Sequence, residues 1–333
     1  MSGYLDLIEC FLYAFFFSLV VSPLVISVMK REKIKQTILH YVDVHKLKNG
    51  TPTMGGLIFL ISITVVSLIC FKGKDSYAKM TILIFLAYGI VGFLDDFIKF
   101  RFKRNLGLRA YQKIIFQLLV SVAVGIFVYK TMGGVVIVPF TNKVIDFGWW
   151  IIPVVVLIYL ATTNSVNLTD GLDGLASSTT LIFMLSFVIL QIIFTETGVI
   201  VSNVSNIEEL RNISIVSVIV CGSLLCFLLF NCFPAKIFMG DTGSLALGSL
   251  IASVSIFSGM ELYIPILGMV FVASAVSVIL QVAYYKLTKK RIFLMAPLHH
   301  HFEKKGVHEV RITFCYSLVS LIVGVVVILI NIL

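Results

Sequence analysis

Long runs of apolar residues dominate the chain, and short polar segments separate them. A membrane-spanning helix needs about 20 mostly apolar residues. Ten runs approach this length: 4–29, 55–71, 78–98, 112–130, 149–164, 175–194, 213–230, 241–258, 262–286 and 312–332. The runs at 149–164 and 241–258 are the weakest of them. The pattern predicts an all-α polytopic membrane protein with about ten transmembrane helices in one bundle.

The composition supports this prediction. Of 333 residues, 59% are hydrophobic and 13% are charged, and the mean hydropathy is +1.04. Soluble domains carry about 25% charged residues, so this chain has too few to cover a water-facing surface. A soluble enzyme, a disordered chain and a disulfide-built secreted module are therefore excluded. The six cysteines lack metal-ligand spacing and are interpreted as small buried hydrophobes. We find no clear internal repeat and expect a single domain over residues 1–333.

The basic residues are distributed unevenly among the loops. The loops after the first, third, fifth, seventh and ninth runs hold 20 Lys and Arg, whereas the other loops hold 6. The positive-inside rule places the first set in the cytoplasm and both termini outside. The net charge of +9 is thus explained by topology, and we expect no nucleic-acid partner.

Four clusters of polar residues fall on this predicted cytoplasmic side. They are Asp95 with Asp96; Asn164, Asn167, Asp170 and Asp173; Asn231, Lys236 and Asp241; and His299, His300 and His301. Carboxylates at a membrane edge are costly, so each needs a physical reason. We expect the four clusters to converge on one site at the inner membrane face.

Each cluster also has a purely structural interpretation. An acidic pair at a helix end can be solvated among lipid headgroups, although adjacent carboxylates repel unless a cation or a proton intervenes. The segment NLTDGLDGLA can be a turn and a helix cap, or it can present Asp170 and Asp173 on one helical face. Asp241 can be the N-cap of the following helix, a role compatible with binding a ligand. Magnesium, which prefers oxygen ligands, would relieve the repulsion among the acids.

The histidines and lysines supply other chemistry near the same face. Consecutive residues on a helix point about 100° apart, so three histidines in a row rarely bind one metal. They suit hydrogen bonding to phosphates and hydroxyls, or acid–base work. Lys48, Lys99, Lys103 and Lys113 supply cations, and simple positive-inside topology is their structural alternative.

The predicted site combines acids that can bind a metal, lysines that can bind phosphates and a water-accessible position beside the lipid. This combination indicates phosphoryl transfer, which needs mainly positioning and charge neutralisation. No P-loop or kinase signature is present, so a bound nucleoside triphosphate is not indicated. The location suggests one lipid substrate and one soluble, nucleotide-linked donor.

Five strings carry a resemblance that spans residues 45–302: HKLKNGTPTMGG, FLDDFIK, NSVNLTDGLDGLA, NCFPAKIFMGDTGSLALG and APLHHHFE. They resemble the phospho-N-acetylmuramoyl-pentapeptide transferases, a branch of the polyprenyl-phosphate N-acetylhexosamine-1-phosphate transferase superfamily. The acidic strings alone indicate the superfamily, whereas TPTMGG together with PLHHHFE is specific to the muramoyl branch.

The resemblance implies transfer from UDP-N-acetylmuramoyl-pentapeptide to undecaprenyl phosphate, forming lipid I and UMP in peptidoglycan synthesis. It also implies a requirement for Mg²⁺, a homodimer, and a place in the lipid bilayer of the bacterial inner membrane. By resemblance, Asp95, Asp96 and Asp241 are metal ligands and, with His300, catalytic residues. The substrate-binding residues that it implies are Lys48, Lys103, Lys113, Asn164, Asn167, Asp170, Gly171, Leu172, Asp173, Asn231, Phe238, His299 and His301.

Three alternatives remain open at this point. A sister transferase would use UDP-N-acetylglucosamine as its donor. An ion-coupled transporter is disfavoured because transporter sites usually lie near mid-membrane, whereas these acids lie at the ends of the spans. For the transfer itself, direct in-line attack is favoured over a covalent phospho-aspartate, since a lipid phosphate with a second pKa of about 6 is already mostly dianionic.

Overall fold

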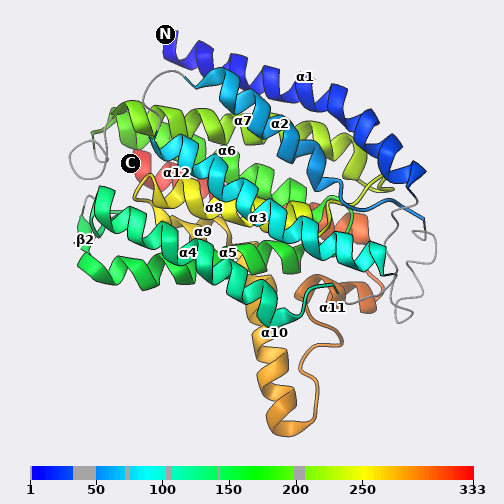
Figure 1. Ribbon diagram of the computed structural model, residues 1–333. Coiled ribbons are helices and arrows are strands. Elements are labelled where there is room, and N and C mark those ends of the chain that lie inside the picture. Colours follow the sequence, from blue (N-terminus) through cyan, green and yellow to red (C-terminus); the bar gives the residue numbers. More distant parts are fainter. Residues whose placement is uncertain (1, 33–49, 72–75, 103–106, 142, 199–206) are drawn as a thin grey trace.

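The computed structural model describes residues 2–32, 50–71, 76–102, 107–141, 143–198 and 207–333 (Figure 1). A helix is present in each of the ten apolar runs, which confirms the predicted fold class. These helices are α1 Ser2–Arg31, α2 Gly56–Cys70, α3 Ser76–Arg101, α4 Ala110–Met132, α5 Ile151–Thr169, α6 Leu175–Glu196, α7 Ile207–Asn231, α8 Gly240–Ile256, α10 Met269–Thr288 and α12 Glu309–Ile332.

Short elements connect them. They are the antiparallel strands β1 Val135–Ile137 and β2 Val144–Asp146, the 3₁₀ helices η2 Gly148–Trp150 and η3 Glu261–Tyr263, and the short helices α9 Ile264–Leu267 and α11 Leu298–Lys304.

Eight helices of the described chain are long and apolar enough to cross a membrane. The other two, α2 and α8, have 15 and 17 residues. The weak hydropathy of α8 has a structural reason, because every residue from Thr242 to Ile256 is buried. Its small residues allow close contact with α3 and α5; a Cβ atom at Gly248 would lie 2.4 Å from the Thr163 Cα. The helix α8 is therefore shielded from lipid, whereas α2 exposes apolar side chains such as Leu68 and Ile69.

The predicted run 262–286 is not one continuous helix. Residues Glu261–Tyr263 form η3, Ile264–Leu267 form α9, and α10 begins only after Gly268. The loss of a backbone donor at Pro265 and the flexibility of Gly268 explain the break. The later part of α10 projects away from the other helices (Figure 1) and carries exposed apolar side chains such as Ile279 and Leu287.

The two termini lie at the same end of the bundle (Figure 1), which we call the terminal end. The opposite end, called the site end, contains the C-terminal ends of α3, α5 and α7 and the N-terminal end of α8. Contacts described below join these helix ends. The arrangement follows from an even number of crossings, as the apolar pattern predicted.

Candidate active site

Three carboxylates meet at the site end. Asp95 and Asp96 lie near the C-terminal end of α3, and Asp241 lies in the first turn of α8. One oxygen from each lies within 4.8 Å of the others. The first two side chains are buried and Asp241 is partly exposed, so the cluster opens to solvent on one side. The sequence prediction that these three acids converge is confirmed.

Glycines bring the two helices close enough for this cluster to form. A Cβ atom at Gly92 would lie 2.1 Å from the Asp241 carbonyl oxygen, a distance that no side chain tolerates. Gly240 has φ +71°, and a Cβ atom there would lie 2.5 Å from Asp96 Oδ2. Both positions therefore need glycine, one for the close packing of α3 on α8 and one for a left-handed turn.

Two lysines lie between the carboxylates. The Lys99 Nζ is 2.6 Å from Asp95 Oδ2 and 2.9 Å from Asp241 Oδ2. The Lys113 Nζ is 3.0 Å from Asp95 Oδ1 and 2.5 Å from Asp241 Oδ2. Each ammonium group therefore bridges α3 and α8, and together the two offset the repulsion among the acids. They are 35% and 22% exposed, so they can also reach a ligand that enters from solvent.

Hydrogen bonds fix the carboxylates further. Asp96 Oδ2 accepts from the Thr242 backbone amide at 2.9 Å and from its hydroxyl at 2.7 Å. Asp241 Oδ1 accepts from Asn167 Nδ2 at 2.7 Å. Asp241 is thus inside the first turn of α8 and does not cap it, so the alternative interpretation of Asp241 as an N-cap is wrong; Met239 occupies that position. The helix instead directs Asp241 sideways, toward α3 and α5.

The turn between α5 and α6 joins this cluster to the histidines. Residues 170–174 form turns and bends, so Asp170 and Asp173 do not share a helical face as one interpretation expected. Burial, followed by the charges of Asp241, Asp96 and Asp173, raises the pKa of Asp170 well above its usual range. Asp173 Oδ2 instead accepts from the Ala235 amide at 2.9 Å, which holds the turn against the segment after α7.

Gly171 makes the contact with α11. A Cβ atom there would lie 2.3 Å from His299 Nε2 and 3.0 Å from His300 Nε2. Two imidazoles therefore lie directly over the backbone of the turn. Each of the four polar clusters named from the sequence contributes residues to the site end, and Leu172 is buried beside them.

The three histidines have three different environments. His299 is fully buried, neither ring nitrogen has a hydrogen-bond partner, and burial lowers its pKa to about 3. His300 Nδ1 lies 2.9 Å from Glu303 Oε2, and His301 Nδ1 accepts from the Leu294 amide at 3.1 Å. The expectation that consecutive histidines do not share one metal agrees with this geometry.

Other predicted residues lie at the edge of the site or outside it. Asn231 accepts from the Ser177 hydroxyl at 2.7 Å and donates to the Ile237 carbonyl at 3.0 Å, so its contacts brace the loop before α8. Asn164 donates to Gln117 Oε1 at 2.9 Å, on the α4 side of α5. Phe238 pairs through its backbone with Pro52 and Gly55. Lys48 and Lys103 lie outside the described residues.

Three residues of the site were not among the predicted site residues. Lys99 was named from the sequence only as one of several nearby cations, and its position four residues after Asp95 on one helix signals the ion pair. Glu303 follows His300 by three positions and was visible in PLHHHFE. Thr242 gave no signal, because its partner Asp96 is 146 residues distant in sequence.

Fold and site together define a multispanning membrane enzyme whose acids and lysines gather at one end. The family model described as glycosyl transferase family 4 matches residues 77–259, and the signature 1 model of the phospho-N-acetylmuramoyl-pentapeptide-transferases matches residues 48–60. The first match includes Asp95, Asp96 and Asp241.

Curated relatives extend the likeness to nearly the whole chain. A phospho-N-acetylmuramoyl-pentapeptide-transferase of Clostridium botulinum (strain Alaska E43 / Type E3) is 44% identical over 96% of this chain and 94% of the relative. Those of Clostridium novyi (strain NT) and Clostridioides difficile (strain 630) are 42% and 39% identical, over 93% and 97% of this chain and 92% and 97% of the relatives. The chain belongs to the phospho-N-acetylmuramoyl-pentapeptide-transferase family.

Proposed function

We propose that the chain transfers phospho-N-acetylmuramoyl-pentapeptide from its UDP conjugate to undecaprenyl phosphate, forming lipid I and releasing UMP. Membership of the family, at up to 44% identity over almost the full length, is the observation that carries this proposal. The lysine-neutralised carboxylate cluster suits it, because phosphoryl transfer depends on positioning and charge stabilisation.

The direct test measures UMP release by the purified chain with undecaprenyl phosphate and each of two donors. We expect release with UDP-N-acetylmuramoyl-pentapeptide and none with UDP-N-acetylglucosamine. Release only with the second donor would assign the sister reaction instead. Substrate flux in liposomes without UMP would indicate the transporter.

Magnesium fits the residues that are present. Asp95, Asp96 and Asp241 offer only hard oxygen ligands within 4.8 Å of one another, the donor set that Mg²⁺ prefers. When bound, the ion supplies charge neutralisation at a diphosphate. Chelation should abolish UMP release and added Mg²⁺ should restore it, whereas full activity in chelator would remove the metal from the proposal.

Different residues of the site would then have different roles in the reaction. Lys99 and Lys113, partly exposed between the acids, would contact the donor phosphates and offset their charge. Asn167, which donates to both Asp241 and Ser244, would hold Asp241 in place. His300, with Nε2 toward the turn at Gly171, would contact phosphate or sugar; the turn itself would take the nucleoside.

Direct attack of the lipid phosphate remains the favoured mechanism. Both oxygens of Asp95 and both of Asp241 already have partners, so neither carboxylate is a poised nucleophile. The lipid phosphate, with a second pKa of about 6, needs no strong base. Incubation with labelled donor alone tests this: we expect no labelled protein, and a phospho-aspartate would reverse the conclusion.

The site is proposed to face the cytoplasm, with both termini outside the bacterial inner membrane. The loop-charge asymmetry of 20 to 6 supports this orientation. Cys232 is exposed beside the site end, so a membrane-impermeant maleimide should label it in inverted vesicles and not in right-side-out ones. The opposite labelling pattern would reverse the orientation.

A homodimer and a single folding domain over residues 1–333 also remain proposals. Exposed apolar faces on α10 and α12 are available for lipid or for a second copy. Light scattering of the detergent-solubilised chain, corrected for bound detergent, would give a dimer mass if the proposal holds and a monomer mass if it does not.

A further inference from the structure

The first two turns of α4 meet the rest of the bundle through few buried side chains. Lys113 lies in this part of the helix and contacts Asp95 and Asp241. Of residues 110–117 only Gln117 is buried, at 1% exposure, whereas the three apolar side chains directly before it are exposed. Gln117 follows Lys113 by four positions, so the two side chains lie on one face of the helix, about one turn apart. The buried residue nearest to Lys113 on α4 is therefore a glutamine.

Hydrogen bonds join Gln117 to the two neighbouring helices. Gln117 Oε1 accepts from Asn164 Nδ2 on α5 at 2.9 Å, and the Gln117 backbone carbonyl accepts from the Tyr88 hydroxyl on α3 at 3.2 Å. Apolar side chains in a membrane gain little by contacting one another instead of lipid, so close packing and interhelical hydrogen bonds decide how helices meet. These two bonds therefore fix the rotation and height of α4 against α3 and α5.

The helices α4 and α5 also meet at Asp241, nearer the site end. The Lys113 Nζ on α4 is 2.5 Å from Asp241 Oδ2, and Asn167 Nδ2 on α5 donates to Asp241 Oδ1 at 2.7 Å. Asn164 precedes Asn167 by three positions, so the amide pair lies about one turn from Asp241 along both helices. A closed set of contacts thus runs from Asp241 along α4, across the amide pair and back along α5.

We propose that Gln117 is a positioning residue of the transfer reaction, because its hydrogen bond with Asn164 holds α4 where Lys113 reaches the carboxylate cluster and the donor phosphates. This inference rests on the proposed function. Gln117 needs no contact with substrate and acts through the ammonium group of Lys113. A fixed positive charge stabilises the transition state without having to reorganise as negative charge develops.

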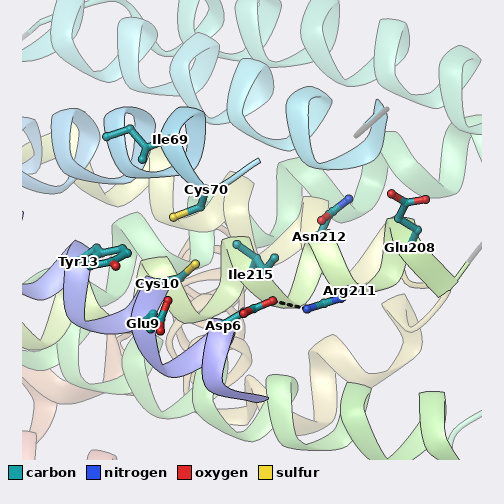
Figure 2. A pocket seen from close by; sticks show the side chains of 10 residues that line it. All are labelled: Asp6, Glu9, Cys10, Tyr13, Ile69, Cys70, Glu208, Arg211, Asn212 and Ile215. Atoms are coloured by element: carbon teal, nitrogen blue, oxygen red, sulfur yellow. Dashed lines mark hydrogen bonds and ion pairs between the residues drawn. The ribbon is translucent and has the colours of Figure 1, made fainter. Parts of the chain in front are cut away.

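An ion pair at the terminal end shows why Lys113 needs this support. Asp6 and Arg211 lie in a cavity of about 430 Å³ between α1, α2 and α7 (Figure 2), and both side chains are at least 40% exposed. Water can replace either partner there, so a displacement costs little. Asp95 is 1% exposed and Asp241 is 16% exposed, so a displaced Lys113 would leave their charge poorly compensated.

The test compares two buried glutamines in the full chain in detergent, with both substrates supplied. Gln117→Leu removes the amide and keeps a side chain of similar size. Gln191→Leu is the matched control, because Gln191 is fully buried at the terminal end and donates to the Leu210 carbonyl and the Ser258 hydroxyl.

We expect kcat and kcat/KM per folded molecule to fall together by about 10-fold in Gln117→Leu, the pattern of an interaction made in the transition state. In Gln191→Leu both should stay close to those of the unsubstituted chain, although its Tm falls as well. An unchanged kcat per folded molecule in Gln117→Leu would overturn the proposal, and so would an equal loss of kcat in Gln191→Leu.

Exchanging the two amides tests the pair and does not depend on leucine being tolerated. Gln117→Asn alone shortens the side chain and should lower kcat, since its oxygen no longer reaches Asn164. Adding Asn164→Gln supplies the missing methylene from α5 and should restore most of the lost turnover. An exchanged variant no more active than Gln117→Asn would overturn the proposal. The unsubstituted chain separates the two proposals: no UMP from it contradicts the proposed function, whereas normal kcat in Gln117→Leu contradicts only the role of Gln117.

Discussion

The two ends of the bundle carry acidic residues in different ways. At the site end, Asp95 and Asp241 are held by the same two lysines, and α3 and α8 meet without space for a Cβ atom. At the terminal end, Asp6 and Arg211 form an ion pair in which both side chains are at least 40% exposed. Exposed ion pairs contribute little free energy, whereas buried charges need every partner they have. Acids at one end are therefore replaceable, and those at the other are not.

The largest difference should follow from removing one negative charge at each end. Asp241→Asn should lower UMP release by about 100-fold or more, the scale on which a preorganised charge-stabilising group contributes. Asp6→Asn should leave UMP release close to that of the unsubstituted chain. Membrane insertion and Tm are checked for both. Near-normal turnover in folded Asp241→Asn would show that this acid is structural, and an equal loss in Asp6→Asn would show that the two ends do not differ.

A second comparison adds a methyl group at two helix contacts. Gly92→Ala and Gly222→Ala both place a Cβ atom against backbone, at 2.1 Å from the Asp241 carbonyl and 2.2 Å from the Phe11 carbonyl. Each should destabilise the chain by about 1–3 kcal/mol. Only Gly92→Ala should also lower UMP release per folded molecule, because only that clash displaces Asp241. Normal turnover in folded Gly92→Ala would mean that the spacing of α3 and α8 is not critical.

A smaller effect is expected where one side chain orients another. Glu303→Ala removes the partner of His300 Nδ1 and should lower UMP release by about 10-fold, the low end for residues that support a functional side chain. Glu303→Gln keeps an acceptor oxygen and should retain more activity. Steady-state kinetics separate kcat from KM for both. Equal losses in the two variants would indicate that the charge matters more than the hydrogen bond.

The smallest predicted effect concerns pH. Burial lowers the pKa of His299 to about 3, whereas an unfolded histidine has a pKa of about 6.5. The unfolded chain therefore binds the additional proton between these values, and folded stability is lost as pH falls below about 6.5. From pH 7.5 to 5.5 the loss should be about 1 kcal/mol. His299→Gln should show a shallower fall in Tm, and parallel curves would contradict the prediction.

The sequence was sufficient to predict the helices and most of the site residues, because both predictions depend on local composition. Each apolar run contains one of the ten long helices, although the run 262–286 is broken before α10, and the cost of charge at a membrane edge singled out Asp95, Asp96 and Asp241. Lys99 could have been added from its spacing to Asp95. The interpretation of Asp241 as an N-cap was wrong, because the helix already begins at Gly240, whose φ of +71° only glycine adopts easily.

The sequence alone determined whether each segment lies in the membrane or in water. A run of apolar residues is more stable out of water, and an acidic residue beside such a run needs a partner for its charge. Only the tertiary structure decided the partners. In the folded chain Lys113 pairs with Asp241, which lies 128 residues away in sequence, and Thr242 donates a hydrogen bond to Asp96. The second contact forms because α8 packs against α3 where glycines permit close approach. The physical reason is one of range. The free energy of transferring a side chain from water to the membrane depends on that residue alone. Ion pairs and hydrogen bonds instead require two groups to come into contact, and helix packing brings groups that are distant in sequence together.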